Sequence, residues 1–138
     1  MTNWVFVETY HNWNQDKKHN FKFLGIRMQV VKSRGLKKND LIFMYVSKIK
    51  KFSDVRVIEN IDLIDLPSTL KYDKDFIKCI ETKIVKELSV DEWIELKKLN
   101  NKLSFLKSEE FLGFLLLRAP IKIDDNDKKI LLNEFNFN

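Results

Sequence analysis

Hydrophobic and polar positions alternate along several stretches of the chain, which is the pattern of β-strands with one buried face. Residues 41–46, LIFMYV, are apolar throughout and predict a strand that is covered on both faces. Along residues 54–66 the alternation breaks near Glu59 and Asn60. The predicted strands are residues 4–9, 41–46, 54–66, 76–88 and 114–119.

Helical spacing and helix-end signals mark other segments. Ser89 and Glu92 form a capping box, and apolar residues recur behind them at helical spacing, so we expect one helix with Trp93 as its core anchor. Gly35 follows a short helical segment and is expected to act as its C-cap. The predicted helices are residues 15–18, 28–33, 89–100 and 124–135.

These elements predict an α+β fold with about five to six mostly antiparallel strands and short flanking helices. With 138 residues, three glycines and two prolines, the chain offers little linker, so we expect a single domain over residues 1–138. A mixed sheet in so small a domain is expected to curl toward a barrel, because strands twist and closure removes edges.

The same sequence predicts a cytoplasmic protein without a membrane partner. Its first residues lack the pattern of a signal peptide, and the longest apolar run, residues 111–117, is far shorter than the ~20 residues of a membrane span. Cys79 is the single cysteine, which fits a reducing compartment. Beside Ile77 and Ile80 it is expected to be a small buried hydrophobe, and a reactive thiol is the alternative.

Positive charge is concentrated in one part of the chain. The net charge is +5, and residues 17–51 carry eleven Lys or Arg against one acid, Asp40. Aromatic residues and two glycines lie within and around this stretch. Phosphates favour such a field and bases stack on aromatic rings, so the stretch suggests nucleic-acid binding. The alternative is that the aromatic residues are core and the lysines are ordinary solvated surface.

Enzyme motifs are missing from the sequence. It contains no Gly-rich phosphate loop, GxSxG elbow, CxxC pair or HExxH motif. His11 and His19 have no cluster of cysteines or carboxylates around them in the sequence, and zinc wants four ligands, or three and a water. We therefore expect no catalysis, no metal and no cofactor. A nucleic-acid-modifying enzyme that uses His11 or His19 is the weaker alternative.

Several short motifs follow one another in the order of a known family. The opening strand precedes Asn12 and Trp13, then come residues 23–27 (FLGIR) and residues 38–47, where KND enters LIFMYVS. This order resembles the EVE domain of the PUA-like superfamily, which is similar to YTH domains. The resemblance covers nearly the whole chain.

The resemblance implies a PUA-like pseudo-barrel that holds a modified base of DNA or RNA in an aromatic-lined pocket. Carried over to this sequence, it implies that the ligand-binding residues are Asn12, Trp13, Phe23, Leu24, Gly25, Ile26, Arg27, Tyr45, Ser47 and Phe114. The expected contacts to the nucleic-acid backbone are Lys17, Lys18, Lys32, Arg34, Lys37, Lys38 and Lys48.

The chain departs from the family pattern at several places. Phe23 or Leu24 stands where the family has a pocket Trp, and Leu24 could not stack a base. Asn39 replaces the turn glycine, which is tolerated because Asn also accepts a positive φ. Residues 114–117 are apolar where the family often has a polar residue. A protein-interaction or small-molecule module, or a homodimer formed through residues 111–117, is therefore the rival interpretation.

Overall fold

A curved sheet with short helices forms the fold, in a computed structural model that describes residues 1–73, 76, 78–106 and 119–136. The predicted α+β class is confirmed. The strands are β1 (Asn3–Glu8), β2 (Phe23–Gly25), β3 (Leu41–Val46), β4 (Lys51–Asp65), β5 (Lys78–Glu87), β6 (Ile94–Glu95) and β7 (Ile121–Ile123). The helices are α1 (Tyr10–Lys18), α2 (Met28–Arg34) and α4 (Asp125–Glu134), with 3-10 turns η1 (Val90–Glu92) and η2 (Leu96–Leu99).

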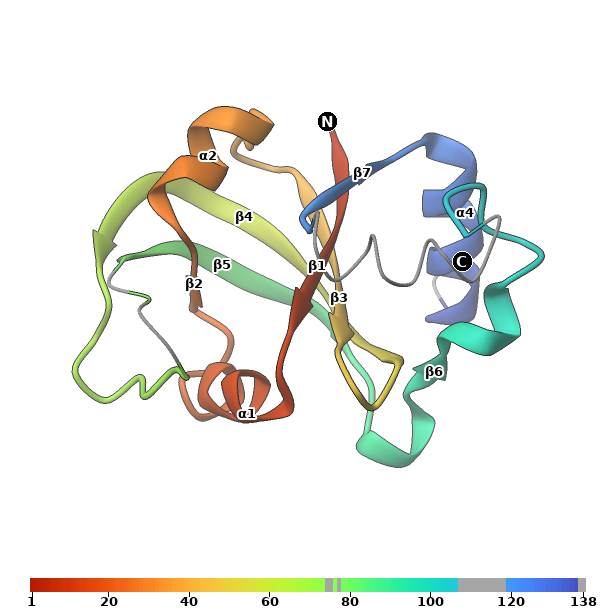
Figure 1. Ribbon diagram of the computed structural model, residues 1–138, viewed down its shortest axis with the longest axis horizontal. Coiled ribbons are helices and arrows are strands. Elements are labelled where there is room, and N and C mark those ends of the chain that lie inside the picture. Colours follow the sequence, from red (N-terminus) through yellow and green to blue (C-terminus); the bar gives the residue numbers. More distant parts are fainter. Residues whose placement is uncertain (74–75, 77, 107–118, 137–138) are drawn as a thin grey trace.

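The strands lie in the order β2-β5-β4-β3-β1-β7, and β6 adds to β4. Only β1 and β3 pair in parallel among the described strands, because α1, β2 and α2 cross over between them. The predicted mostly antiparallel sheet is therefore confirmed. In the view of Figure 1, α1, β2 and α2 lie on one side of the β1–β3 pair, and β6 and α4 lie on the other.

The long strand β4 bends as it runs through the sheet. Its pairing with β5 shifts register between Val55 and Arg56 and again between Ile58 and Asn60. Such bulges add a residue on one strand and increase the local twist. The predicted break near Asn60 coincides with one of these shifts, so the sequence pattern indicates where the strand becomes irregular.

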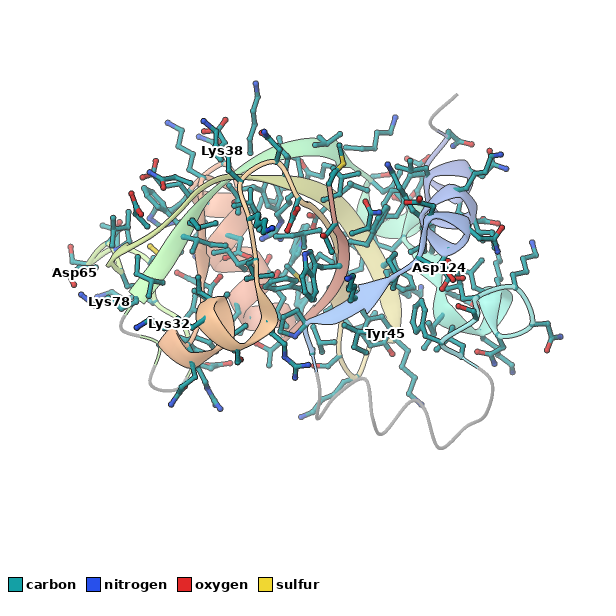
Figure 2. The ribbon with its side chains drawn as sticks, turned by 90° about the horizontal axis from the view of Figure 1, so that it is seen from above. Lys32, Lys38, Tyr45, Asp65, Lys78 and Asp124 are labelled. Atoms are coloured by element: carbon teal, nitrogen blue, oxygen red, sulfur yellow. The ribbon has the colours of Figure 1, made fainter. Side chains whose placement is uncertain are left out.

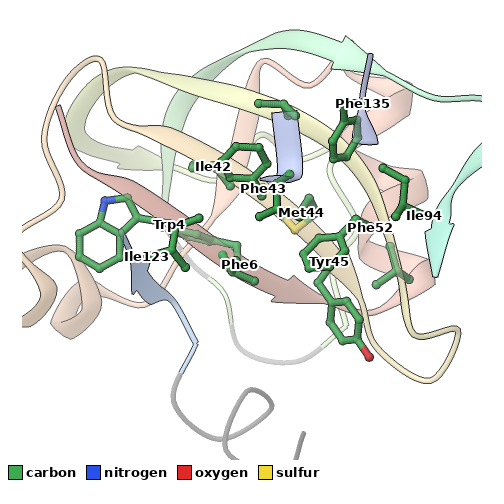
Figure 3. Close-up of a cluster of buried hydrophobic side chains, with 14 of the residues drawn as sticks. Trp4, Phe6, Ile42, Phe43, Met44, Tyr45, Phe52, Ile94, Ile123 and Phe135 are labelled. Atoms are coloured by element: carbon green, nitrogen blue, oxygen red, sulfur yellow. The ribbon is translucent and has the colours of Figure 1, made fainter. Parts of the chain in front are cut away.

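The core is built on β3, whose residues Ile42 to Val46 are all buried. The fully apolar run therefore forms a strand that is covered on both faces, as predicted. Phe43 lies 6.3 Å from the Phe135 ring at the end of α4, and Phe52 of β4 packs edge-on to Tyr45. Figure 3 shows these rings together with Met44 and Ile94 in one cluster.

The predicted helix over residues 89–100 is wrong. The segment instead forms η1, the short strand β6 and η2. Ile94 pairs with Phe52, and the Leu96 N–H donates to the Lys50 carbonyl at 3.1 Å. Sheet pairing with the start of β4 thus satisfies backbone groups that a helix would have bonded internally, and tertiary contacts override the local preference.

The other predicted helices are present, one of them longer than expected. Helix α1 begins at Tyr10 because the Thr9 hydroxyl accepts a hydrogen bond from the Asn12 N–H at 3.2 Å and caps the helix. Gly35 has a φ of 74° and ends α2, as predicted. Asn39 has a φ of 75° in the turn before β3. The strand predicted over residues 114–119 lies almost wholly outside the described residues.

Candidate ligand pocket

A pocket of about 730 Å³ opens where β1, β2 and the start of α2 meet the loop that follows β4. Its size falls in the range of about 300–1,000 Å³ that small-molecule sites occupy. The lining comes from five parts of the chain, which are residues 6–9 with Asn12, residues 24–27 with Val30, residues 44, 47 and 48, residues 72, 73 and 76, and residues 119 and 120.

Much of the predicted ligand-binding set lines this pocket. The members found there are Asn12, Leu24, Gly25, Ile26, Arg27 and Ser47. Lys48, which was predicted to contact a nucleic-acid backbone, lines it as well. Ser47 lies beside the end of β1 because it directly follows β3, whose last residue Val46 pairs with Glu8. Gly25 ends β2, and its strand end lies across the pocket lining from these residues.

Trp13 lies in the core and is not part of the pocket lining. Its ring is 1% exposed and packs edge-on to Trp93 at 4.7 Å. The indole N–H donates to the Asp54 carboxylate at 2.8 Å. Trp13 therefore holds α1 against β4, which is a structural role.

Two further predicted aromatic residues also lie away from the pocket. Phe23 is half-buried on β2 beside the His19 ring, and Tyr45 is 3% exposed. Burial raises the pKa of the Tyr45 hydroxyl. Phe114 lies outside the described residues, so its predicted role stays a prediction.

The aromatic walls of the pocket are residues that the sequence reading missed. Tyr72 and Phe76 come from the loop between β4 and β5, and their rings meet edge-on with centroids 5.4 Å apart. The Arg27 guanidinium lies 5.8 Å from the centre of the Phe76 ring. Tyr72 was the available signal, because it lies in a segment rich in Lys and Asp that no predicted strand or helix includes. Phe76 was assigned to the strand predicted over residues 76–88, but β5 begins at Lys78 and leaves Phe76 in the loop.

The Tyr72 ring lies directly against the backbone of Gly25. A Cβ at position 25 would meet Tyr72 Cε2 at 2.3 Å. The two residues are also joined by the Gly25 N–H, which donates to the Tyr72 hydroxyl at 3.2 Å. The close approach of the Tyr72 ring is therefore the reason that position 25 holds a glycine.

Helix α1 holds the loop that carries Tyr72. The Asn12 side-chain carbonyl accepts from the Asp73 N–H at 2.8 Å, and the Gln15 side-chain carbonyl accepts from the Lys71 N–H at 2.9 Å. Both side chains are buried, whereas the loop residues that donate to them are exposed. Asn12 therefore contributes to the pocket by positioning the backbone beside Tyr72.

Both histidines join the same contact between α1 and the loop. His11 Nε2 lies 2.6 Å from the Lys71 carbonyl, and His19 Nε2 lies 2.8 Å from the Thr69 hydroxyl. Neither histidine belongs to the pocket lining. Through these contacts both histidines support the loop between β4 and β5.

A buried charge cluster lies behind the pocket wall. The guanidinium of Arg56 is fully buried and binds Glu8 at 3.0 Å, Asp16 at 2.7 Å and Asp54 at 2.7 Å. The Tyr72 hydroxyl donates to the Asp16 carboxylate. One cation therefore meets three carboxyl groups, and the cluster joins β1, α1 and β4 to the loop.

The excess of carboxyl groups changes their acidity. Burial, followed by the nearby Asp16 carboxylate, raises the pKa of Glu8 well above its ordinary value, although Arg56 opposes the shift. Burial also raises the pKa of Asp16 and, together with Asp16, the pKa of the Tyr72 hydroxyl. Glu8 Oε2 is buried without a hydrogen-bond partner among the described residues. Glu8 is therefore the carboxyl group whose charge is least compensated.

The predicted backbone-binding residues lie mostly at the surface. Lys17 binds Glu87 at 2.7 Å, and the remaining members are exposed on α1, on α2 and in the turns on either side of β3. Figure 2 shows Lys32 and Lys38 on the half of the molecule that carries α2, and Asp124 on the half that carries α4. Their contact with phosphate stays a prediction.

The described residues contain neither a candidate metal cluster nor a helix that could span a membrane. No cluster of three or more His, Cys, Asp or Glu side chains suited to a metal ion occurs in residues 1–73, 76, 78–106 and 119–136. Within the same ranges, every helix is too short or too polar to cross a membrane.

No family model and no curated protein matches this sequence. Solved structures do match it. The YTH domain of Zygosaccharomyces rouxii MRB1, in complex with N6-methyladenosine RNA, is 12% identical with a TM-score of 0.68, over 99% of this chain and 85% of that one. Human THYN1, in complex with 5-methylcytosine containing DNA, is 12% identical with a TM-score of 0.59, over 100% of this chain and 99% of that one.

A hypothetical protein of Leishmania major also matches, at 14% identity with a TM-score of 0.65, over 98% of this chain and 94% of that one. At these identities the likeness concerns the fold. The chain has an EVE/YTH-like PUA fold, and the fold implied by the sequence motifs is confirmed.

Proposed function

We propose that this protein is a non-catalytic nucleic-acid-binding module that takes a modified base of DNA or RNA into the pocket. The observation that carries the proposal is the pocket lining itself. Two loop aromatic residues, Tyr72 and Phe76, meet the end of β2 and the cationic side chains of Arg27 and Lys48 in one cavity.

Each part of this lining suits one part of a nucleotide. Stacking on an aromatic ring contributes about 1–3 kcal/mol per base. The apolar side chains of Leu24 and Ile26 suit a methyl group, because burying a CH₂ or CH₃ group contributes about 0.8 kcal/mol. Arg27 and Lys48 suit the flanking phosphates, which set affinity rather than selectivity.

The matched folds support a modified base as the ligand. One of the solved structures is a complex with N6-methyladenosine RNA and another is a complex with 5-methylcytosine containing DNA. Both ligands carry a methylated base, although they differ in the nucleic acid. For this chain we therefore propose the class of ligand and leave DNA and RNA as two arms of the test.

The test is a binding panel with matched aromatic variants. Single-stranded DNA and RNA oligonucleotides with and without one methylated base are titrated by fluorescence anisotropy at several salt concentrations. Phe76→Ala removes a pocket wall, whereas Phe23→Ala removes an equal ring that lies outside the pocket. We expect Phe76→Ala to abolish the preference for the modified strand and Phe23→Ala to retain it.

Two outcomes would contradict the proposal. The first is that wild-type protein binds neither modified nor unmodified strands. The second is that Phe23→Ala, and not Phe76→Ala, removes the preference, which would place the base on the β2 aromatic ring that the sequence motifs suggested. The rival interaction module rests on residues 111–117, which lie outside the described residues.

A further inference from the structure

The groups behind the pocket wall include an excess of carboxyl groups over cations. Glu8 lines the pocket, and Asp16 from α1 and Asp54 from β4 share with it a single cation, Arg56. All four side chains are buried. Their charges are therefore screened much less than those of surface groups, and they act across the thickness of the wall.

The lining adds one further carboxylate and two cations, all three of which are exposed to solvent. The exposed carboxylate of Asp73 lies in the lining beside Tyr72. Arg27 and Lys48 are also exposed, and long charged side chains keep their heads in water. Solvent and salt weaken these two positive charges at the rim more than they weaken the buried carboxylates.

Glu8 shows that this excess is not compensated within the protein. The charged groups that face it are Asp16, Asp54 and Arg56, and its Oε2 has no hydrogen-bond partner among the described residues. Burial, and after it Asp16, raises the pKa of Glu8. A cation placed in the pocket would lower the cost of ionising this carboxyl group, so by linkage the carboxyl group favours a cation.

The aromatic walls also suit a cation. The Arg27 guanidinium already lies 5.8 Å from the centre of the Phe76 ring, so one face of this ring is within reach of a planar positive group. Aromatic rings attract cations through their quadrupole, and more strongly when the cation has left water. A flat, cationic heterocycle would be attracted to the Tyr72 and Phe76 rings by the same cation–π interaction.

We propose that the pocket selects a base made cationic by methylation of a ring nitrogen over the neutral isomer with the same methyl group elsewhere. This inference rests on the proposed function, because it concerns the ligand of the same pocket. The two classes can be compared as isomers. At neutral pH 1-methyladenine carries a positive charge that N6-methyladenine lacks, and 3-methylcytosine is related to 5-methylcytosine in the same way.

The experiment uses the intact protein and four single-stranded RNA pentamers that carry one of these four bases in the same flanking sequence. Affinities are measured at neutral pH and fixed salt. The expected result is a preference for the cationic isomer on the order of tenfold in both pairs. Two pairs are needed because methylation of a ring nitrogen also removes a hydrogen-bond acceptor from the base.

Three charge variants show whether the preference comes from the acids of the pocket. Glu8→Gln removes the carboxyl group that a bound cation would ionise, Asp73→Asn removes an exposed carboxylate, and both changes nearly conserve size, so each is expected to lower the preference severalfold. Asp125→Asn removes an exposed charge at the start of α4, outside the pocket lining, and is expected to retain it. Asp73 lies at the surface, so its variant carries the test if Glu8→Gln fails to fold.

The outcomes separate this inference from the proposed function. Equal binding of the isomers, or tighter binding of the neutral ones, overturns the inference and leaves the protein a reader of neutral modified bases. A preference that survives both acid variants also overturns it. Binding to none of the four pentamers and to no modified DNA strand overturns the proposed function, and the inference falls with it.

Discussion

The Tyr72 hydroxyl accepts a hydrogen bond from the Gly25 N–H, and the Tyr72 ring fills the space that a side chain at position 25 would need. The ring cannot simply turn away, because its hydroxyl also donates to the buried Asp16 carboxylate. One pocket wall is therefore fixed by the absence of a side chain on the facing strand.

Gly25→Ala is expected to displace Tyr72 and to remove ligand selectivity. Overpacking of this kind costs about 1–3 kcal/mol of unfolding free energy, measured by urea denaturation. Gly35→Ala is the control, because a Cβ there meets nothing within 4 Å and the cost arises from its φ of 74° alone. That variant should lose about 1–2 kcal/mol and keep its selectivity. Equal selectivity in both variants would contradict the prediction.

Arg56→Met is expected to destabilise the fold strongly. The substitution leaves Glu8, Asp16 and Asp54 buried without their cation, and breaking a buried pair in this way costs about 3–5 kcal/mol. Lys102→Met is the matched control, because Lys102 binds Glu134 at 3.7 Å on the surface, where a pair contributes about 0–1 kcal/mol. Denaturant unfolding measures both, and similar losses would argue against a buried cluster.

Stability should fall with rising pH because of Glu8. Its pKa in the folded state is raised above the ordinary value of 4.5, so the folded state binds its proton more tightly than the unfolded state. This contribution is complete below pH 4.5 and is lost as the pH rises through the raised value. Glu8→Gln removes the titration and should gain melting temperature relative to wild type between pH 5 and pH 8.

Groups that do not interact with Glu8 titrate alike in both proteins and cancel in this comparison. One of them is Asp65, whose pKa is lowered by the hydrogen bond from Lys78. Burial raises the pKa of Asp16, which adds to the same trend, and because Asp16 interacts with Glu8 its contribution is part of the measured difference. A difference between Glu8→Gln and wild type that is the same at pH 5 and pH 8 would exclude the raised pKa of Glu8.

Lys37→Ala with Lys38→Ala is expected to weaken binding to all nucleic-acid strands alike. For single strands, each lost phosphate contact reduces the slope of log affinity against log salt by about 0.7. Lys97→Ala with Lys98→Ala removes the same charge from η2, outside the predicted backbone-binding set. A salt series with both double variants measures the effect, and equal slopes would show that the charge acts without a defined contact.

Strands β1, β3, β4 and β5 and helices α2 and α4 could be predicted because their patterns are local, whereas the short strands β2, β6 and β7 were not predicted. Continuous apolarity marked β3, and alternation marked β4 and β5. Gly35 marked the end of α2. The segment over residues 89–100 has equally good local signals for a helix. The helix prediction failed because the segment pairs with the start of β4, about forty residues earlier, and this pairing is favoured over the local helix.

The pocket was predictable where it follows backbone order and unpredictable where it depends on loops. Residues 24–27 and Ser47 lie at strand ends that the motifs located. Tyr72 and Phe76 lie in a loop without periodicity, so only the fold reveals which ring faces the ligand. Trp13 shows the opposite error, because a conspicuous aromatic residue is more often core than wall, and replacing it would test folding rather than selectivity.

The Arg56 cluster also bears on how the pocket comes into existence during folding. The guanidinium binds Asp16 across 40 positions of the chain and Glu8 across 48. No continuous fragment shorter than this span can close the network, and loop closure over such distances is slow. We therefore expect the ligand site to form late in folding, when β1, α1 and β4 meet.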